Sequence, residues 1–279
     1  MPLTFVLLLL SVAAVWLPAP RRAWPAAAPP WAVLYVLATG AAMVQGFVRW
    51  PGVAALAGLA ALAWAAGRLR GPGLRAIAWA GLLVLCAALL LHRVPGFAPA
   101  AWLDGVRWSA QSPPFNKLLH FDKGAVGLLL VAFLAARRRT GGLLPGAGIG
   151  MATVLLVLGM ALAAGLVRPD PKWSATLGLF LLVNLALTCV AEEAVFRLLV
   201  QDPLARRWGA ACGVAVSALL FGLVHAGGGP WLVALASLSG LGAALAYAAS
   251  GRIAVPIGVH FAVNAVHAIF FTYPALARG

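Results

Sequence analysis

Long apolar segments follow one another along almost the whole length of this chain. A helix that crosses a bilayer needs roughly 17 to 25 predominantly apolar residues, and by that measure the sequence offers about ten candidate spans. The sequence therefore predicts an all-α fold, a polytopic transmembrane helical bundle of about ten spans. The spans are expected near residues 2–18, 31–48, 52–67, 76–92, 121–136, 147–167, 175–200, 210–227, 231–250 and 253–272.

The composition favours a membrane protein over a soluble one. Hydrophobic residues make up 63% of the 279 residues and charged residues only 9%, too few to cover the surface of a soluble domain. The formal net charge of +14 comes mainly from arginines clustered between the apolar segments, so we expect no nucleic-acid partner. Cys86, Cys189 and Cys212 lie in apolar segments without ligand spacing and predict neither a disulfide nor a zinc motif.

Arginine clusters occupy alternate connections between the predicted spans. The positive-inside rule assigns these connections to the cytoplasm, so both termini are expected on the outside. The first apolar segment lacks a basic leader, which favours a retained span over a cleaved signal peptide. We expect an integral protein of a bacterial inner membrane, in contact with membrane lipid. The clusters contain Arg21, Arg22, Arg68, Arg70, Arg75, Arg137 to Arg139, Arg206, Arg207 and Arg252.

The longest interruption between apolar segments, residues 93–120, has a composition typical of the membrane interface. It combines aromatic residues such as Trp102 and Trp108 with Pro and Arg. We expect a lid or an interfacial helix there. Residues 1–120, which include this interfacial loop, are predicted to form an accessory N-terminal transmembrane region, and residues 121–279 a core of six spans.

Two adjacent carboxylates interrupt the seventh apolar segment, in "CVAEEAVFRLL" at residues 189–199. Glu192 and Glu193 are the only glutamates of the chain. Ionisable side chains at membrane depth persist almost only where they face a protein interior and find partners. On a helix, Arg197 is the i+4 neighbour of Glu193 and can neutralise it, while Glu192 points about 100° away. A carboxylate without such a partner suits a general base working near neutral pH, although a purely structural link between helices is the alternative.

Polar side chains also interrupt the eighth and tenth apolar segments. His225 closes the eighth in "FGLVH", and "HFAVNAVH" in the tenth contains His260, Asn264 and His267. His260 and Asn264 are i,i+4 neighbours with His267 at i+7, so all three share one helical face. Imidazole and carboxamide donors on one face can hold a developing oxyanion. A packing role for each histidine is the alternative, most of all for His267.

The three motifs together resemble the CAAX protease and bacteriocin-processing (CPBP) family of intramembrane proteases, which includes the Ras-converting CAAX endopeptidase. The resemblance rests on Glu192-Glu193-x-x-x-Arg197, Phe221-x-x-x-His225 and His260-x-x-x-Asn264, in this order within residues 175–272. Many relatives have a glycine where this chain has Leu198.

The resemblance implies a glutamate-dependent endopeptidase whose site lies inside a membrane cavity. Glu192 and His225 would position and deprotonate a water, His260 and Asn264 would stabilise the oxyanion, and Glu193 and Arg197 would support them. We expect no cofactor. Zinc held by Glu192, His225 and His260 is the less favoured alternative, because Asn264 is a better oxyanion donor than a zinc ligand.

The resulting hypothesis is an endopeptidase that hydrolyses a peptide bond in a membrane-associated or lipid-anchored protein or peptide. Its partner would be a peptide or the C-terminal segment of a membrane-anchored protein. The alternatives are a transporter or proton-coupled carrier with a buried Glu/His relay, and a proteolytically silent scaffold. The inverted repeats of many carriers are not evident in the sequence.

The predicted span boundaries leave one difficulty in this hypothesis. If the seventh span ends near residue 200 and the eighth starts near 210, Glu192 lies about 12 Å and His225 about 24 Å from the cytoplasmic side. The two side chains would not meet. We therefore expect the loop between the spans to be partly embedded, or the eighth helix to begin outside the hydrocarbon.

Overall fold

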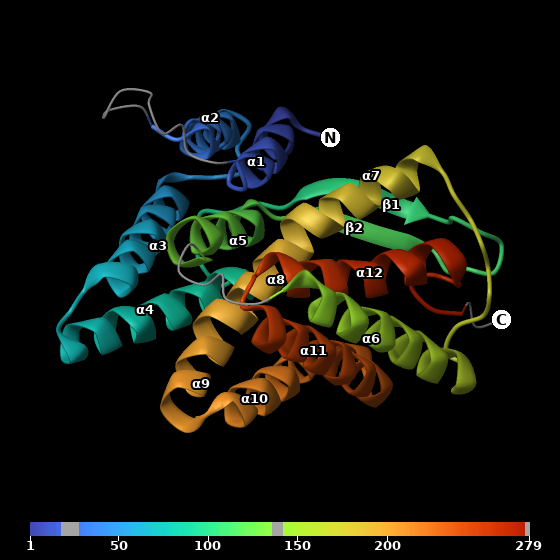
Figure 1. Cartoon of the computed structure of the whole chain (residues 1–279). Coiled ribbons are helices and arrows are strands. Elements are labelled where there is room, and N and C mark those ends of the chain that lie inside the picture. Colours follow the sequence, from blue (N-terminus) through green and yellow to red (C-terminus); the bar gives the residue numbers. More distant parts are fainter. Residues whose placement is uncertain (18–27, 136–141, 277–279) are drawn as a thin grey trace. The chain divides into compact units, whose positions relative to one another are not determined.

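The structure is a computed structural model that describes residues 1–17, 28–135 and 142–276. Each of the ten predicted spans contains a helix (Figure 1). The arginine clusters at 21–22 and 137–139 lie outside the described residues. The elements are α1 (Leu3–Ala14), α2 (Pro30–Val44), α3 (Trp50–Arg68), α4 (Pro72–Leu90), β1 (Ala100–Val106), β2 (Phe115–Leu119), α5 (Phe121–Leu134), α6 (Leu143–Ala163), α7 (Ala175–Val183), α8 (Val190–Glu193), α9 (Asp202–Trp208), α10 (Ala210–Leu223), α11 (Pro230–Ser250) and α12 (Ala254–Phe270), with π-helical turns at Asn184–Cys189 and Ala194–Gln201 and a 3₁₀ turn at Ala226–Gly228.

Helices make up most of the described chain, which confirms the predicted all-α class. Within the described ranges, five helical segments are long and apolar enough to cross a membrane, and shorter apolar helices of 10 to 17 residues accompany them. The count of about ten spans is therefore not confirmed. The five segments are Trp50–Arg68, Pro72–Leu90, Leu143–Ala163, Ala175–Trp208 and Pro230–Ser250.

The prediction of an interfacial helix within residues 93–120 is wrong, because a two-stranded sheet of β1 and β2 forms there. The adjacent Pro113 and Pro114 lack backbone N–H donors and disfavour a helix. Gly105 adopts a φ of 62°, a left-handed conformation that glycine reaches without strain. Its backbone N–H donates to the Asn116 side chain at 2.6 Å, linking the two strands.

The chain divides into two compact units. The first comprises residues 1–102, 117–136 and 186–191, and the second residues 103–116, 137–185 and 192–279. In the first, α1 packs against α2 and α5, and α3 packs against α4 and α5. In the second, α11 packs against α6, α10 and α12, and α6 also packs against α12. Helix α5 thus belongs with the N-terminal helices, and the predicted boundary at residue 120 stays a prediction.

The seventh predicted span continues well past its expected end. Helical and π-helical turns run from Ala175 to Trp208, a segment of 34 residues, before the chain reverses at Gly209 with a φ of 90°. Glu192 lies 17 residues before this reversal and His225 lies 16 residues after it. Glu192 and His225 are therefore nearly the same number of residues from the reversal. The difference in depth expected for a span that ends at residue 200 disappears.

Small residues let the helices of the second unit approach closely. A Cβ added at Gly222 of α10 would lie 2.7 Å from the Val233 carbonyl oxygen of α11. A Cβ at Gly242 of α11 would lie 2.5 Å from Thr153 Cγ2 of α6. Such small-residue contacts are typical of packed membrane helices. They fix the ends of α10 and α11 that carry part of the site.

Candidate active site

The Glu193–Arg197 pair forms a fully buried polar centre beside the cavity described below. Both side chains are 0% exposed, and Arg197 Nε donates to Glu193 Oε2 at 2.7 Å. Arg197 Nη1 donates to Gln201 Oε1 at 3.1 Å and to Ser217 Oγ at 3.0 Å. The i,i+4 pairing predicted from the sequence is therefore present, and the guanidinium compensates the buried carboxylate.

His260 lies between the two glutamates. Its Nδ1 is 3.0 Å from Glu193 Oε1, which fixes Nδ1–H as a donor to the carboxylate. Its Nε2 is 3.9 Å from Glu192 Oε2, longer than a direct hydrogen bond and open to a bridging water. Glu192 retains 16% side-chain exposure, whereas Glu193 has none. The adjacent glutamates thus differ in surroundings: Glu193 is paired with Arg197, and Glu192 lies near the other nitrogen of the imidazole.

The carboxamide of Asn264 is oriented by a second amide. Asn264 Nδ2 donates to Asn184 Oδ1 at 3.0 Å, and Asn184 lies in the π-helical turn before the glutamates. Asn184 is buried, with 6% exposure. It lies eight residues before Glu192 and was not predicted from the sequence, because its side chain is not ionisable. A search for any polar side chain in the apolar segments would have identified it, together with Gln201.

His225 joins the site through Phe221. Its Nδ1 donates to the Phe221 carbonyl oxygen at 2.7 Å, which leaves Nε2 as the nitrogen that carries the lone pair in the neutral ring. The Phe221 ring centroid lies 5.1 Å from that of His225 and 5.3 Å from that of His260. Phe221 therefore separates and aligns the two imidazoles.

Residues of the second and third motifs line one cavity of about 660 Å³ within the second unit, and the glutamates of the first motif lie next to it through their contacts with His260. His225, His260 and Asn264 line it directly, and so does His267. The other walls are largely apolar, so the cavity combines a few polar side chains with an apolar lining. The apolar walls include Val157, Leu158, Leu166, Trp231, Leu232, Leu235 and Val263.

The group of described side chains closest to a metal-binding arrangement is not the group named in the zinc alternative. Among the described residues, the group of three metal-ligating side chains whose ligand atoms lie within 4.8 Å of one another is His92, His120 and Asp122, in the first unit. There His92 Nδ1 already bonds Asp122 Oδ2 at 2.8 Å, and the two imidazole rings are stacked at 3.7 Å with an interplanar angle of 19°. Stacked rings cannot both direct an in-plane lone pair at one ion, so this cluster is not arranged as a metal site.

Comparison with known families identifies the same part of the chain. Residues 174–266 match a family model described as Type II CAAX prenyl endopeptidase Rce1-like. The matched segment contains all seven motif residues named from the sequence. No curated protein and no solved structure matches the chain.

Proposed function

We propose that this chain, which belongs through residues 174–266 to the type II CAAX prenyl endopeptidase Rce1-like family of peptidases, hydrolyses a peptide bond of a membrane-associated protein or peptide inside its cavity. The observation that carries the proposal is the pairing of Glu192 with His260 Nε2 at 3.9 Å, beside a cavity lined by His225 and Asn264. An acid, two imidazoles and a carboxamide at one apolar cavity are the groups that peptide hydrolysis by activated water requires.

Glu192 is the general base in this proposal. A water held between its carboxylate and the lone pair on His225 Nε2 gives a proton to Glu192 as its oxygen attacks the scissile carbonyl carbon. The tetrahedral intermediate then collapses, the carbon–nitrogen bond breaks, and Glu192 returns the proton to the leaving amine. The side chain of Glu192 keeps 16% exposure, which supports this role because a water can reach the carboxylate.

His260 and Asn264 stabilise the oxyanion. The Glu193 carboxylate holds Nδ1 of His260, and in this proposal Nε2 donates to the oxyanion from the wall of the cavity. Asn264 is held by Asn184 through one N–H of its amide. Hydrogen-bond donors that are already held in place need not reorient when negative charge develops on the oxyanion. This preorganisation is the main source of oxyanion stabilisation.

The proposal is tested by Glu192→Gln, which keeps the shape of the side chain and removes the base. We expect a loss of cleavage of at least about 10²-fold, with the protein still folded and inserted. Asp104→Asn, which removes an exposed carboxylate from β1, is the matched control and is expected to retain activity. Full turnover by purified Glu192→Gln would rule out this mechanism.

Substrates are identified by comparing protein C-termini in cells that carry the wild-type chain or Glu192→Gln. We expect C-termini created by cleavage of membrane-anchored proteins to depend on Glu192. If reconstituted protein instead moves a solute across liposomes without cleaving any peptide, a carrier function replaces the peptidase proposal.

A further inference from the structure

The C-terminal segment 271–276, here called the strap, crosses beside the connection between α6 and α7. Phe271 and Pro169 form an antiparallel bridge. Thr272 N donates to the Arg168 carbonyl at 3.0 Å, and Leu276 N donates to the Leu166 carbonyl at 3.1 Å. Main-chain hydrogen bonds near both ends therefore hold the strap beside this connection.

The strap forms one wall of the catalytic cavity. Pro274, Ala275 and Leu276 line the same cavity as His260 and Asn264. The opposing walls come largely from α6, α11 and α12, whose positions are fixed by helix packing. The strap has no helix of its own, so its position depends on the bonds that fasten it.

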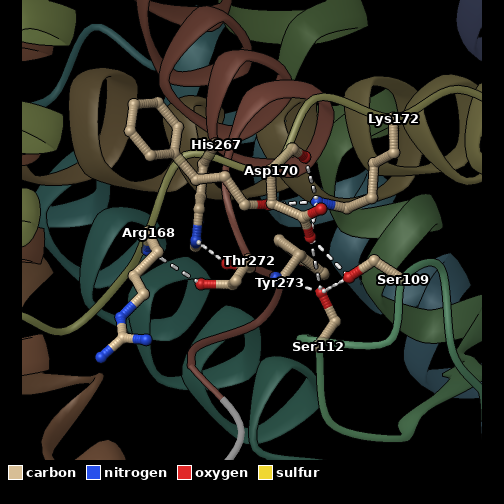
Figure 2. Close-up of polar contacts among 9 residues, drawn as sticks. Ser109, Ser112, Arg168, Asp170, Lys172, His267, Thr272 and Tyr273 are labelled. Atoms are coloured by element: carbon tan, nitrogen blue, oxygen red, sulfur yellow. Dashed lines mark hydrogen bonds and ion pairs between the residues drawn. The ribbon is translucent and has the colours of Figure 1, made fainter.

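A polar network fastens the strap, and Figure 2 shows it. Lys172 Nζ donates to the Phe271 carbonyl and to the Asp170 carbonyl, and it pairs with Asp170 Oδ2 at 3.2 Å. Both side chains are largely buried, at 8% and 13% exposure. Ser109 Oγ donates to Asp170 Oδ2, and Tyr273 N donates to Ser112 Oγ at 3.0 Å.

The same network reaches the face of α12 that carries the site. His267 Nε2 lies 3.2 Å from the Thr272 carbonyl oxygen, so this bond links the strap to the helix of His260 and Asn264. The Arg168 side chain is exposed and points away from the network in Figure 2, and its backbone N–H donates to Thr272 Oγ1. The network thus relies on Lys172 for its positive charge.

We propose that the strap is the substrate-selecting wall of the cavity, that Leu276 is a specificity-determining residue, and that Lys172 is the positioning residue that holds the strap. The proposal rests on the proposed peptidase function. The selected group is an apolar side chain next to the scissile bond, because Leu276 lines the same cavity as the apolar side chains of Leu158, Trp231 and Leu235.

The position of the strap is tested by thiol labelling, which requires no peptidase activity. Ser239 lines the cavity with 7% exposure, so Ser239→Cys in a Cys212→Ala background reports access to the interior. Adding Lys172→Met removes the donor to Phe271 and is expected to raise the labelling rate about tenfold or more, since local opening controls access to buried groups. Arg168→Gln removes one positive charge from the same connection while keeping its backbone amide, and is expected to leave the rate unchanged.

The role in selection is tested with peptide substrates that differ in the apolar side chain next to the cleaved bond. Leu276→Ala keeps the backbone bond to Leu166 and enlarges the cavity, so kcat/KM for phenylalanine relative to valine is expected to rise about tenfold. Lys172→Met is expected to raise KM with little change in kcat, because it does not touch the residues that activate water.

The two hypotheses fail in different ways. If the wild type cleaves peptides but neither the labelling rate nor the phenylalanine-to-valine ratio changes in these variants, the strap proposal is overturned. If labelling responds to Lys172→Met while the wild type cleaves no peptide, the strap is supported as the cavity wall and the peptidase proposal is overturned.

Discussion

At the scale of single residues, the buried Glu193–Arg197 pair explains why two adjacent glutamates have different chemistry. Glu193 accepts hydrogen bonds from Arg197 and from His260, so its charge is compensated within the protein. Glu192 lies 3.9 Å from Nε2, the other nitrogen of His260. A charge pair fully removed from water stabilises little by itself, but it fixes the orientation of the imidazole.

Arg197→Met is expected to destabilise the fold strongly, because it leaves Glu193 charged and unpaired in a fully buried position. Loss of one partner of such a pair costs about 3 to 5 kcal/mol, and thermal unfolding in detergent measures it. The double variant Glu193→Gln/Arg197→Met should recover much of that stability without recovering activity. Arg206→Gln is the control, since its ion pair with Asp202 is long, at 3.9 Å, and partly exposed. A stable single Arg197→Met variant would contradict the prediction.

Asp170, in the connection between α6 and α7, makes stability depend on pH. Burial raises the pKa of its carboxyl, but hydrogen bonds from Ser109 and Lys172 and the lysine charge outweigh burial and leave the pKa below its ordinary value. Because the folded pKa lies below the unfolded one, the carboxylate stabilises the fold above the unfolded pKa. This contribution is lost as the pH falls through the folded pKa.

Asp170→Asn should therefore lower the melting temperature at neutral pH. The difference from the wild type should shrink as the pH falls from about 5 to about 2. Thermal melts across that range measure the difference, with Asp104→Asn as the exposed control. A difference that does not vary with pH would show that the carboxylate charge is not what holds the network.

At the scale of secondary-structure elements, apolar segment length predicted the positions of the helices but not how long they continue. The extension of the seventh segment to Trp208 was missed because Asp202, in the first turn of α9, and Arg206 and Arg207, in its last turn, are polar residues that hydropathy assigns to a loop. The sheet of β1 and β2 was missed because strand pairing depends on a partner segment that short-range composition does not specify. The i,i+4 pairs of α12 and of the glutamate segment were predictable, since helix geometry alone sets them.

Gly222→Ala tests the close packing of α10 against α11, on which the position of His225 depends. The new Cβ would lie 2.7 Å from the Val233 backbone oxygen, and α11 cannot move away without opening the cavity wall. Overpacking of this kind costs about 1 to 3 kcal/mol, so we expect a lower melting temperature. Gly159→Ala on α6 meets no atom within 4 Å and should be neutral or slightly stabilising, as helix propensity predicts. Equal melting temperatures for the two variants would contradict the tight interface.

At the scale of the whole molecule, the sequence predicted candidate site residues and, through the family resemblance, a cavity, but not the residues that form its walls. Spacing placed His260 and Asn264 on one face, their polarity within apolar segments singled out Glu192 and His225, and the resemblance assigned the four residues their proposed roles. The contribution of the strap could not be foreseen, because its bonds join residues about 100 positions apart, such as Lys172 and Phe271, which no local pattern relates.

The positive-inside rule predicts which end of the second unit faces the cytoplasm. Arg206 and Arg207 precede the reversal at Gly209 and Arg252 follows α11 at the same end, whereas residues 164–174 and 224–229 at the other end together hold Arg168 and Lys172. The first end should therefore lie in the cytoplasm and the second outside.

Two exposed tryptophans allow this orientation to be measured: Trp208, 63% exposed, and Trp173, 69% exposed. In a Cys212→Ala background, a membrane-impermeant maleimide added to spheroplasts should label Trp173→Cys, and should label Trp208→Cys only after permeabilisation.

Labelling of Trp208→Cys alone in intact spheroplasts would invert the topology and place the strap on the cytoplasmic side. Equal labelling of both variants before permeabilisation would contradict a second unit that spans the membrane. The expected pattern would mean that the strap is reached from outside the cytoplasm, so that substrates selected there approach from the extracytoplasmic face.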